Sequence, residues 1–102
     1  MKKFTLYLGL NDKDKKIQLI NTVEAYKIVN NIITSYTDGA TIFEASGIYK
    51  HENGTVTIEK TLRIELLFIE KSTVLEIVKQ LKTIFNQESV ALSEEEIKSE
   101  LI

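Results

Sequence analysis

The sequence predicts a single α+β domain of the ferredoxin-like type, with two helices on one face of a four-stranded antiparallel sheet. Segments with alternating apolar residues and segments with helical spacing follow one another in the order β-α-β-β-α-β. The pair Asn53-Gly54 marks a hairpin near the middle of the chain. The chain has 102 residues and no Pro, and no internal repeat is visible. We therefore expect residues 1–102 to form one domain.

The first strand is predicted at residues 3–10. Phe4, Leu6, Leu8 and Leu10 alternate there with other residues and so share one face. Strict alternation of this kind is typical of a strand that is buried on one side. A polar loop follows it.

The first helix is expected to begin after Asn21, which is a good N-cap, with Glu24 at the capping-box position. We expect it to end near Thr37-Asp38-Gly39, where Gly39 can adopt the left-handed conformation. Its apolar face would comprise Val23, Tyr26, Val29, Ile32 or Ile33, and Tyr36.

Residues 40–70 are predicted to form one long hairpin. If Asn53 and Gly54 are a two-residue turn, Phe43 lies opposite Ile64 and Glu44 lies opposite Arg63. The face away from the helices would then carry Ile42, Glu44, Ser46, Ile48, Glu59, Arg63 and Glu65. A bulge at Gly47 would shift this register by one residue.

The second helix is expected to begin at Thr73 and to stop at Asn86, with an apolar stripe through Val74, Ile77 and Leu81. A short last strand is predicted at residues 88–92. Residues 93–102 form a tail that fits either a helix start or an edge strand. The crossover rule places the first and third strands side by side, and we expect them to be parallel.

Composition excludes several classes of function. The net charge is −2 and the pI is about 5.4, so we expect no binding to nucleic acid and none to a membrane. The chain contains no Cys, and its single His, His51, has no second ligand for zinc, so we expect no metal and no cofactor. The N-terminus lacks a signal-peptide pattern, and no run is long enough to cross a membrane. We expect a soluble, cytoplasmic protein.

Arg63 is the only Arg among many Lys residues, and Arg is favoured where planar, bidentate recognition matters. One interpretation is a contact to a small anionic ligand, with hydroxyl groups from Ser46 and Thr61. The other interpretation is a cross-strand salt bridge with Glu44.

Several short motifs resemble an uncharacterised bacterial domain family of unknown function. They are Thr5-Leu6-Tyr7-Leu8-Gly9, Asp38-Gly39-Ala40-Thr41, Ala45-Ser46-Gly47-Ile48-Tyr49, Gly54, Glu59 and Phe85-Asn86-Gln87-Glu88-Ser89-Val90. The resemblance implies a compact α+β domain and brings no activity with it. Small members without an export signal look like phage accessory proteins. Gln87 and Ser89 either satisfy backbone groups at their junction or line a pocket beside Tyr49 or the loop after the first strand.

The leading hypothesis is a non-enzymatic, oligomeric binding module that sequesters a small anionic or nucleotide-type ligand at a subunit boundary. The predicted ligand-binding residues are Arg63, Glu44, Ser46, Thr61, Tyr7, Tyr49, Gln87 and Ser89. A homo-oligomer would use an apolar patch on the open face that includes Ile42, Leu67 and Ile69. The first alternative is a module or inhibitor that binds a protein partner through that face. The second is a small acid–base enzyme that uses Glu44 or Glu65.

Overall fold

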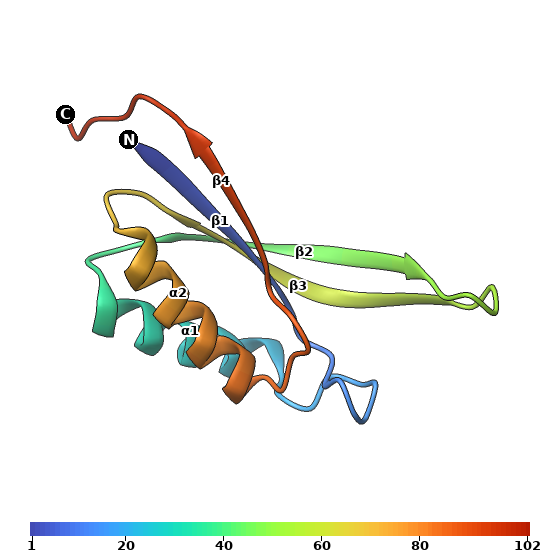
Figure 1. Cartoon of the computed structure of the whole chain (residues 1–102). Coiled ribbons are helices and arrows are strands. Elements are labelled where there is room, and N and C mark those ends of the chain that lie inside the picture. Colours follow the sequence, from blue (N-terminus) through green and yellow to red (C-terminus); the bar gives the residue numbers. More distant parts are fainter.

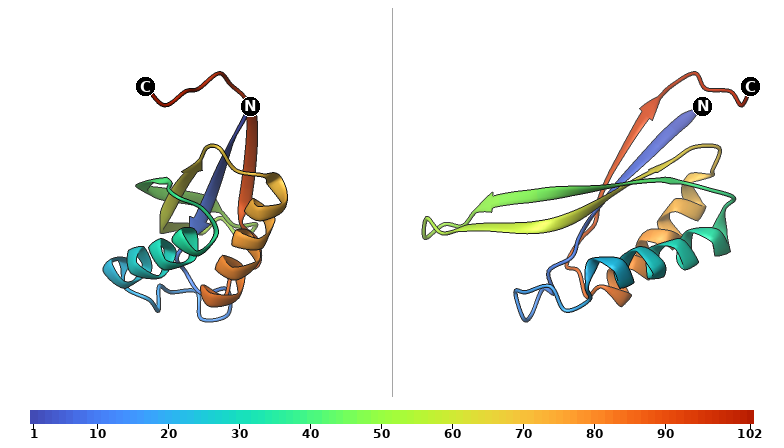
Figure 2. Two further views of the ribbon diagram at one scale, coloured as in Figure 1. Left: turned by 90° about the vertical axis from the view of Figure 1, so that its left-hand side faces the viewer. Right: turned by 180° about the vertical axis from the view of Figure 1, so that it is seen from behind.

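The computed structural model describes all 102 residues and has the predicted order of elements. The sheet order is β2-β3-β1-β4, and every neighbouring pair is antiparallel. Both helices lie on the same face of the sheet (Figure 2). No helix is long and apolar enough to span a membrane. The elements are β1 (Lys2–Gly9), α1 (Thr22–Tyr36), β2 (Thr41–Lys50), β3 (Val56–Leu66), α2 (Lys71–Ile84) and β4 (Ala91–Glu96) (Figure 1).

The first and third strands are neighbours, as predicted, but they run antiparallel, so the expected parallel pairing is wrong. One helix connects β1 to β2, which makes these two strands run in the same direction. β3 turns back from β2 through a hairpin and lies between them. It therefore runs opposite to both neighbours.

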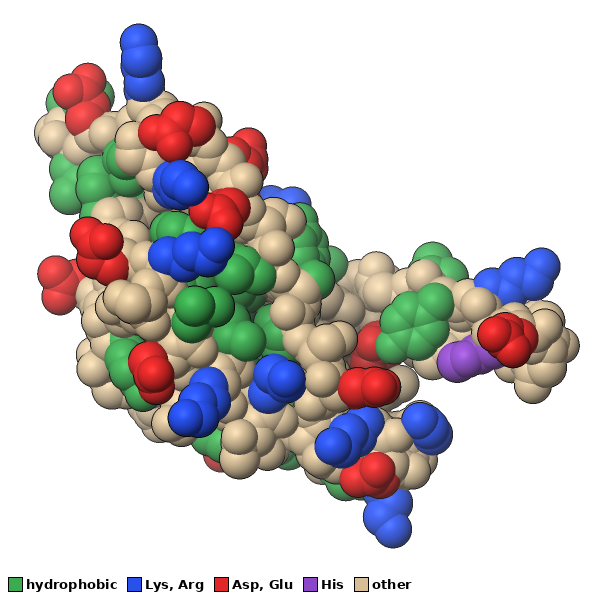
Figure 3. Space-filling view, in the orientation of Figure 1, with side chains coloured by type: hydrophobic (Ala, Val, Ile, Leu, Met, Phe, Trp, Pro, Cys, Tyr) green, Lys and Arg blue, Asp and Glu red, His purple; other side chains and the backbone are tan.

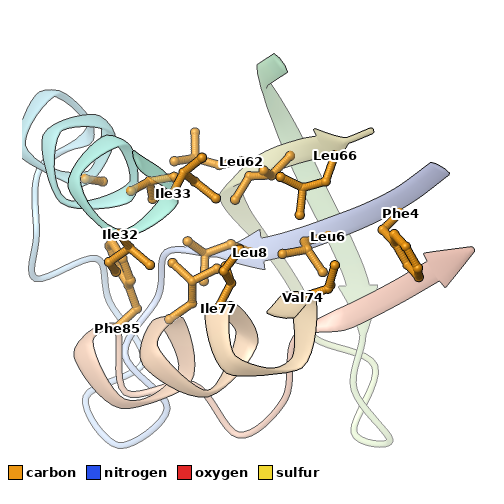
Figure 4. Close-up of a cluster of buried hydrophobic side chains, with 14 of the residues drawn as sticks. Phe4, Leu6, Leu8, Ile32, Ile33, Leu62, Leu66, Val74, Ile77 and Phe85 are labelled. Carbon is orange, nitrogen blue, oxygen red and sulfur yellow. The ribbon is translucent and has the colours of Figure 1, made fainter. Parts of the chain in front are cut away.

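The core lies between the sheet and the helices and follows the predicted alternation in β1. Phe4, Leu6 and Leu8 are buried, as are alternate residues in the second half of β3. α2 contributes an apolar stripe with the predicted spacing (Figure 4). The buried residues from these last two elements are Leu62, Ile64, Leu66, Val74, Ile77 and Leu81.

α1 begins where predicted, but its buried face differs in part. The side chain of Asn21 accepts a hydrogen bond from the backbone N–H of Glu24 at 2.9 Å, which confirms the N-cap. Val23 and Tyr36, both predicted for the apolar face, are exposed, and the buried set is Ala25, Val29, Ile32 and Ile33. Ala25 extends the i, i+4 series to Val29 and Ile33 and lets the helix lie close to the sheet.

Two of the three predicted helix boundaries are confirmed. α1 ends at Tyr36 with Thr37 as its C-cap, next to the predicted segment 37–39, but Gly39 does not have the predicted positive φ. α2 begins at Lys71, earlier than expected, after Glu70, which makes no side-chain capping bond. Asn86 does adopt the left-handed conformation, with φ of 47°, and ends α2 as predicted.

The first part of the tail continues the last strand and is not a helix. β4 begins at Ala91, within the predicted 88–92 segment, runs to Glu96, and pairs with β1 along its whole length. Its acidic side chains are held by cations: Glu94 binds Lys2 at 3.0 Å and Lys71 at 2.7 Å. These contacts favour the extended form of a segment that also fits a helix start.

The hairpin register differs from the prediction by one residue. His51 donates its N–H to the carbonyl of Thr55, and Gly54 donates its own to the carbonyl of His51. Gly54 has φ of +87°. The loop therefore has three residues, Glu52 to Gly54, in the common arrangement of a type I turn followed by a left-handed residue.

This shift reverses the two faces of β2. Phe43 pairs with Arg63, and Gly47 pairs with Glu59, so both lie on the open face away from the helices. The predicted Glu44–Arg63 pair is wrong. Glu44 lies on the helix side and binds Lys60 at 3.1 Å. The side chains moved from the predicted open face to the helix side are Ile42, Glu44, Ser46 and Ile48.

The distal halves of β2 and β3 extend beyond the helices as a two-stranded arm (Figure 1). Hydrophobic side chains are visible on its surface (Figure 3). Ile48 and Ile58 lie directly opposite each other there, and both are mostly exposed. An isolated two-stranded ribbon is marginally stable unless something packs on it.

Candidate functional site

The candidate site is centred on the carboxylate of Glu59, at the base of the arm on the open face. Glu59 is one of only three buried polar or charged residues. Its Oε1 accepts a hydrogen bond from the Tyr49 hydroxyl at 2.5 Å, and its Oε2 accepts one from the Asn11 backbone N–H at 2.9 Å. Three segments therefore hold this carboxylate: β2, β3 and the loop after β1.

Two glycines make room for side chains of this site. A Cβ atom on Gly9 would lie 2.6 Å from Oε1 of Glu59, which is closer than real Cβ atoms come to an oxygen. A Cβ atom on Gly47 would lie 3.0 Å from the hydroxyl of Thr61. Gly9 therefore makes room for the carboxylate, and Gly47 makes room for the neighbouring Thr61.

No cation of the chain neutralises Glu59. The structure contains seven ion pairs, and none of them involves this residue. Burial of a carboxylate is costly unless it is paired and hydrogen-bonded. Its two donors here are neutral, so the site retains a negative charge that a cationic ligand would compensate.

The contact with Glu59 changes the acidity of the Tyr49 hydroxyl. The hydrogen bond to Glu59 raises the pKa of the Tyr49 phenol, and desolvation raises it further. Removing the proton would place a phenolate against a carboxylate. The edge of one ring meets the face of the other between Tyr49 and His51, with centroids 5.9 Å apart, and His51 Nε2 hydrogen-bonds Thr57 Oγ1 at 2.6 Å. Through His51, residues next to the hairpin turn thus restrict the orientation of the Tyr49 ring.

The predicted residues Arg63, Thr61 and Tyr7 do share the open face. Thr61 lies in the row of paired residues next to Glu59, and Arg63 and Tyr7 lie in the row after that. The Arg63 guanidinium lies over the ring of Phe43, 4.3 Å from its centroid, and its Nη2 lies 3.4 Å from Glu65. Arg63 therefore has a carboxylate partner, though a different one from that predicted. Its Nε is buried without a hydrogen-bond partner.

Ser46 and Glu44 do not join this group, because the register places them on the opposite face. Gln87 makes the structural contacts that were one of its two interpretations. Its side-chain amide donates to the carbonyl of Asn11 at 2.7 Å and to that of Phe85 at 3.2 Å. It thereby anchors the residue whose N–H binds Glu59. Ser89 is exposed and makes no hydrogen bond within the chain.

The three residues predicted for an oligomer interface do not form an open-face patch. Ile42 and Ile69 pack against the core. Leu67 lines a cavity of about 370 Å³ together with Phe68 and Leu101. Leu67 and Ile69 would lie on the open face only if the alternation of β3 continued past Leu66. The strand ends at Leu66, so these two residues do not follow the alternation.

Glu59, Asn11 and Gly9 were not predicted as site residues. Glu59 stood among the residues that carry the family resemblance, and this was a usable signal. The backbone N–H of Asn11 has no signature in a side-chain pattern. The role of Gly9 depends on which side chain crosses it, and that follows only from the correct register.

Two cavities lie at the other end of the sheet, around Phe68, with volumes of about 420 and 370 Å³. Their lining residues do not include Glu59 or Tyr49. The Glu59 site is therefore separate from both cavities.

Two solved structures share the fold. A phage SAM lyase in complex with S-methyl-5′-thioadenosine aligns with a TM-score of 0.68 and 22% identity, over 93% of this chain and 80% of that one. A phage SAM lyase in the apo state aligns with a TM-score of 0.67 and 19% identity, over 92% and 78% of the two chains. No curated protein matches the sequence.

A family model described as "Protein of unknown function (DUF3574)" matches residues 3–100. This match covers nearly the whole domain, including every segment that builds the Glu59 site. It agrees with the family resemblance carried by the short motifs of the sequence. The chain therefore belongs to the DUF3574 family of proteins of unknown function.

Proposed function

We propose that this protein binds a nucleoside-type cation of the S-adenosylmethionine class at the Glu59–Tyr49 site. The observation that carries the proposal is the buried Glu59 carboxylate, which has two neutral donors and no cation. A sulfonium compound supplies a positive charge but no N–H or O–H at that charge. It would therefore approach the carboxylate without displacing either existing hydrogen bond.

The ligand proposed here is cationic, whereas the ligand expected from Arg63 alone was anionic. A free guanidinium would favour an anion, but Arg63 already lies beside Glu65. Glu59 is the buried charge left without a counter-ion. The shared fold of a phage SAM lyase bound to S-methyl-5′-thioadenosine supports the nucleoside class. Because a fold hosts many functions, this support is by analogy.

We place the site at a boundary between copies of the chain. Ligand sites normally bury most of the ligand surface, and Glu59 lines neither of the two cavities around Phe68. A second copy would supply the missing wall. The arm carries Ile48, Val56 and Ile58, which are more than half exposed and lie on the face opposite to Glu59. The arm of one copy would therefore lie with this apolar face over the Glu59 site of its neighbour.

The binding test is calorimetric titration of the wild type with S-adenosylmethionine. We expect saturable binding, and we expect Glu59→Gln to weaken it by roughly tenfold or more, since the Coulomb attraction between opposite unit charges about 4 Å apart near a protein surface is worth at least that factor. The matched control is Glu44→Gln. This carboxylate lies on the same hairpin but on the opposite face, and its loss should leave the affinity unchanged.

Chromatography of the same incubation separates sequestration from cleavage. Intact S-adenosylmethionine recovered after long incubation would support a binding protein. Release of S-methyl-5′-thioadenosine would instead assign a lyase activity to the same site. No binding by the wild type, or equal binding by the wild type and Glu59→Gln, would contradict the proposal.

The boundary placement is tested by native mass spectrometry. We expect a defined oligomer for the wild type, and a shift to monomer with loss of binding for Ile48→Glu or Ile58→Glu. Leu75→Glu is the control, because Leu75 is half exposed on the remote helix α2. A wild-type monomer that binds the ligand would overturn the boundary placement and leave the Glu59 site standing.

A further inference from the structure

A row of three side chains crosses the open face beside the Glu59 site. Tyr7 on β1, Arg63 on β3 and Phe43 on β2 lie directly opposite one another in the sheet register. Each keeps about two-fifths of its surface exposed. Directly opposite residues have Cβ atoms about 5 Å apart, so the three side chains form one continuous patch of two rings and a guanidinium.

Between this row and Glu59 lies a row of small side chains. It consists of Gly9, Thr61 and Ala45, which are also paired across the three strands. Four residues separate Glu59 from Arg63, so their Cα atoms are about 13 Å apart at the usual rise per residue. The open face thus has a carboxylate at one end, a flat floor in the middle, and an aromatic and guanidinium row at the other end.

The composition of this row suits a planar ligand. An exposed aromatic pair beside the only Arg of the chain offers stacking surface for a planar group.

We propose that Tyr7, Arg63 and Phe43 bind the base of the nucleoside whose cationic end lies at Glu59. This inference rests on the proposed function and adds an orientation to it. The base stacks against the aromatic and guanidinium row, the sugar crosses the floor of small residues, and the 5′ substituent reaches the carboxylate. Aromatic rings and guanidinium planes are the common partners of unpaired bases. The ligand class that fits this surface is a purine nucleoside with a positive charge on its 5′ substituent.

The test compares S-adenosylmethionine with S-methyl-5′-thioadenosine, which keeps the nucleoside and lacks the positive charge. Phe43→Leu and Tyr7→Leu retain apolar bulk and remove the rings. We expect each to weaken both ligands by the same factor, about five- to a hundredfold, which corresponds to loss of one stacking contact. Glu59→Gln should weaken only S-adenosylmethionine. Phe68→Leu, an exposed aromatic at the other end of the sheet, is the control and should change neither.

The outcomes separate the two proposals. If S-adenosylmethionine binding depends on Glu59 but not on the rings, the orientation is wrong and the proposed function stands. A loss confined to S-adenosylmethionine in the ring variants would also overturn the orientation, because the rings would then contact the cation. If neither ligand binds the wild type, the proposed function itself fails. Circular dichroism of each variant checks that the fold is retained.

Discussion

At the residue scale, the site depends on one carboxylate whose position is set by what lies beneath it. Glu59 is held by the Tyr49 hydroxyl and the Asn11 N–H and crosses Gly9. Each of these contacts belongs to a different segment. A change in any one of these contacts should therefore shift the position of the Glu59 carboxylate.

The pKa of Tyr49 is a direct measure of its contact with Glu59. This pKa is raised above the ordinary value, first by the hydrogen bond to Glu59 and then by desolvation. A raised folded-state pKa means that the stabilising contribution of the bond is present below about pH 10 and is lost as the pH rises through the folded pKa. Glu59→Gln should lower the pKa of Tyr49, as measured by phenolate absorbance. An unchanged Tyr49 titration would show that the bond does not persist in solution.

Gly9→Ala tests the floor of the site. The new Cβ would displace the Glu59 carboxylate and cost its hydrogen bonds, so we expect a loss of about 1–3 kcal/mol in the free energy of unfolding. Gly39→Ala is the matched control, because a Cβ there meets nothing within 4 Å, and it should be neutral or slightly stabilising. Urea unfolding measures both variants. Equal stabilities would contradict the close approach.

At the element scale, the register of the β2–β3 hairpin decides which residues share the open face with Glu59. The sequence predicted the hairpin and the facing of β3, because alternation in Leu62, Ile64 and Leu66 is unambiguous. It did not predict which side chains of β2 point toward the helices. Their direction depends on the length of the hairpin loop, which has three residues instead of two, and the pair Asn-Gly is compatible with either length. One residue of register therefore moved Glu44 and Ser46 out of the candidate site.

Gly54 holds this register through its left-handed backbone, with φ of +87°. Gly54→Ala should destabilise the protein by about 1–2 kcal/mol, which is the cost of that conformation for a residue with a side chain. Gly54→Asn should cost less, because Asn tolerates the left-handed region. Thermal unfolding of the two variants gives the comparison. If Ala and Asn were tolerated equally well, the turn in solution would be of another type.

At the scale of the whole molecule, one cluster of charged side chains near the two chain termini joins β4 to β1 and to the start of α2. Glu94 on β4 binds Lys2 on β1 and Lys71 at the start of α2, and these bonds lower the pKa of Glu94. A lowered folded-state pKa means that the contribution is present above the ordinary carboxyl range and is lost as the pH falls through the folded pKa. Glu94→Gln should therefore flatten the fall of Tm in acid. An identical acid profile for the two proteins would contradict this role.

The overall fold was predictable because its signals are redundant across many residues. The alternating strand that opens the chain, the N-cap at Asn21 and the apolar stripe of α2 each agree with the same architecture. The tail was ambiguous because its form depends on cations supplied by β1 and α2. The site was largely unpredictable for a related reason. Its central carboxylate is recognised only through partners that are far apart in sequence.

The most direct test of the central claim is an amide NMR titration of the wild type with S-adenosylmethionine. The Asn11 N–H donates to Glu59 and lies at the proposed site, so its signal should shift first, together with those of Gly9 and Gly47. That result would place the ligand at the buried carboxylate on the open face. Shifts confined to the cavities around Phe68, or no shifts at saturating ligand, would contradict the account.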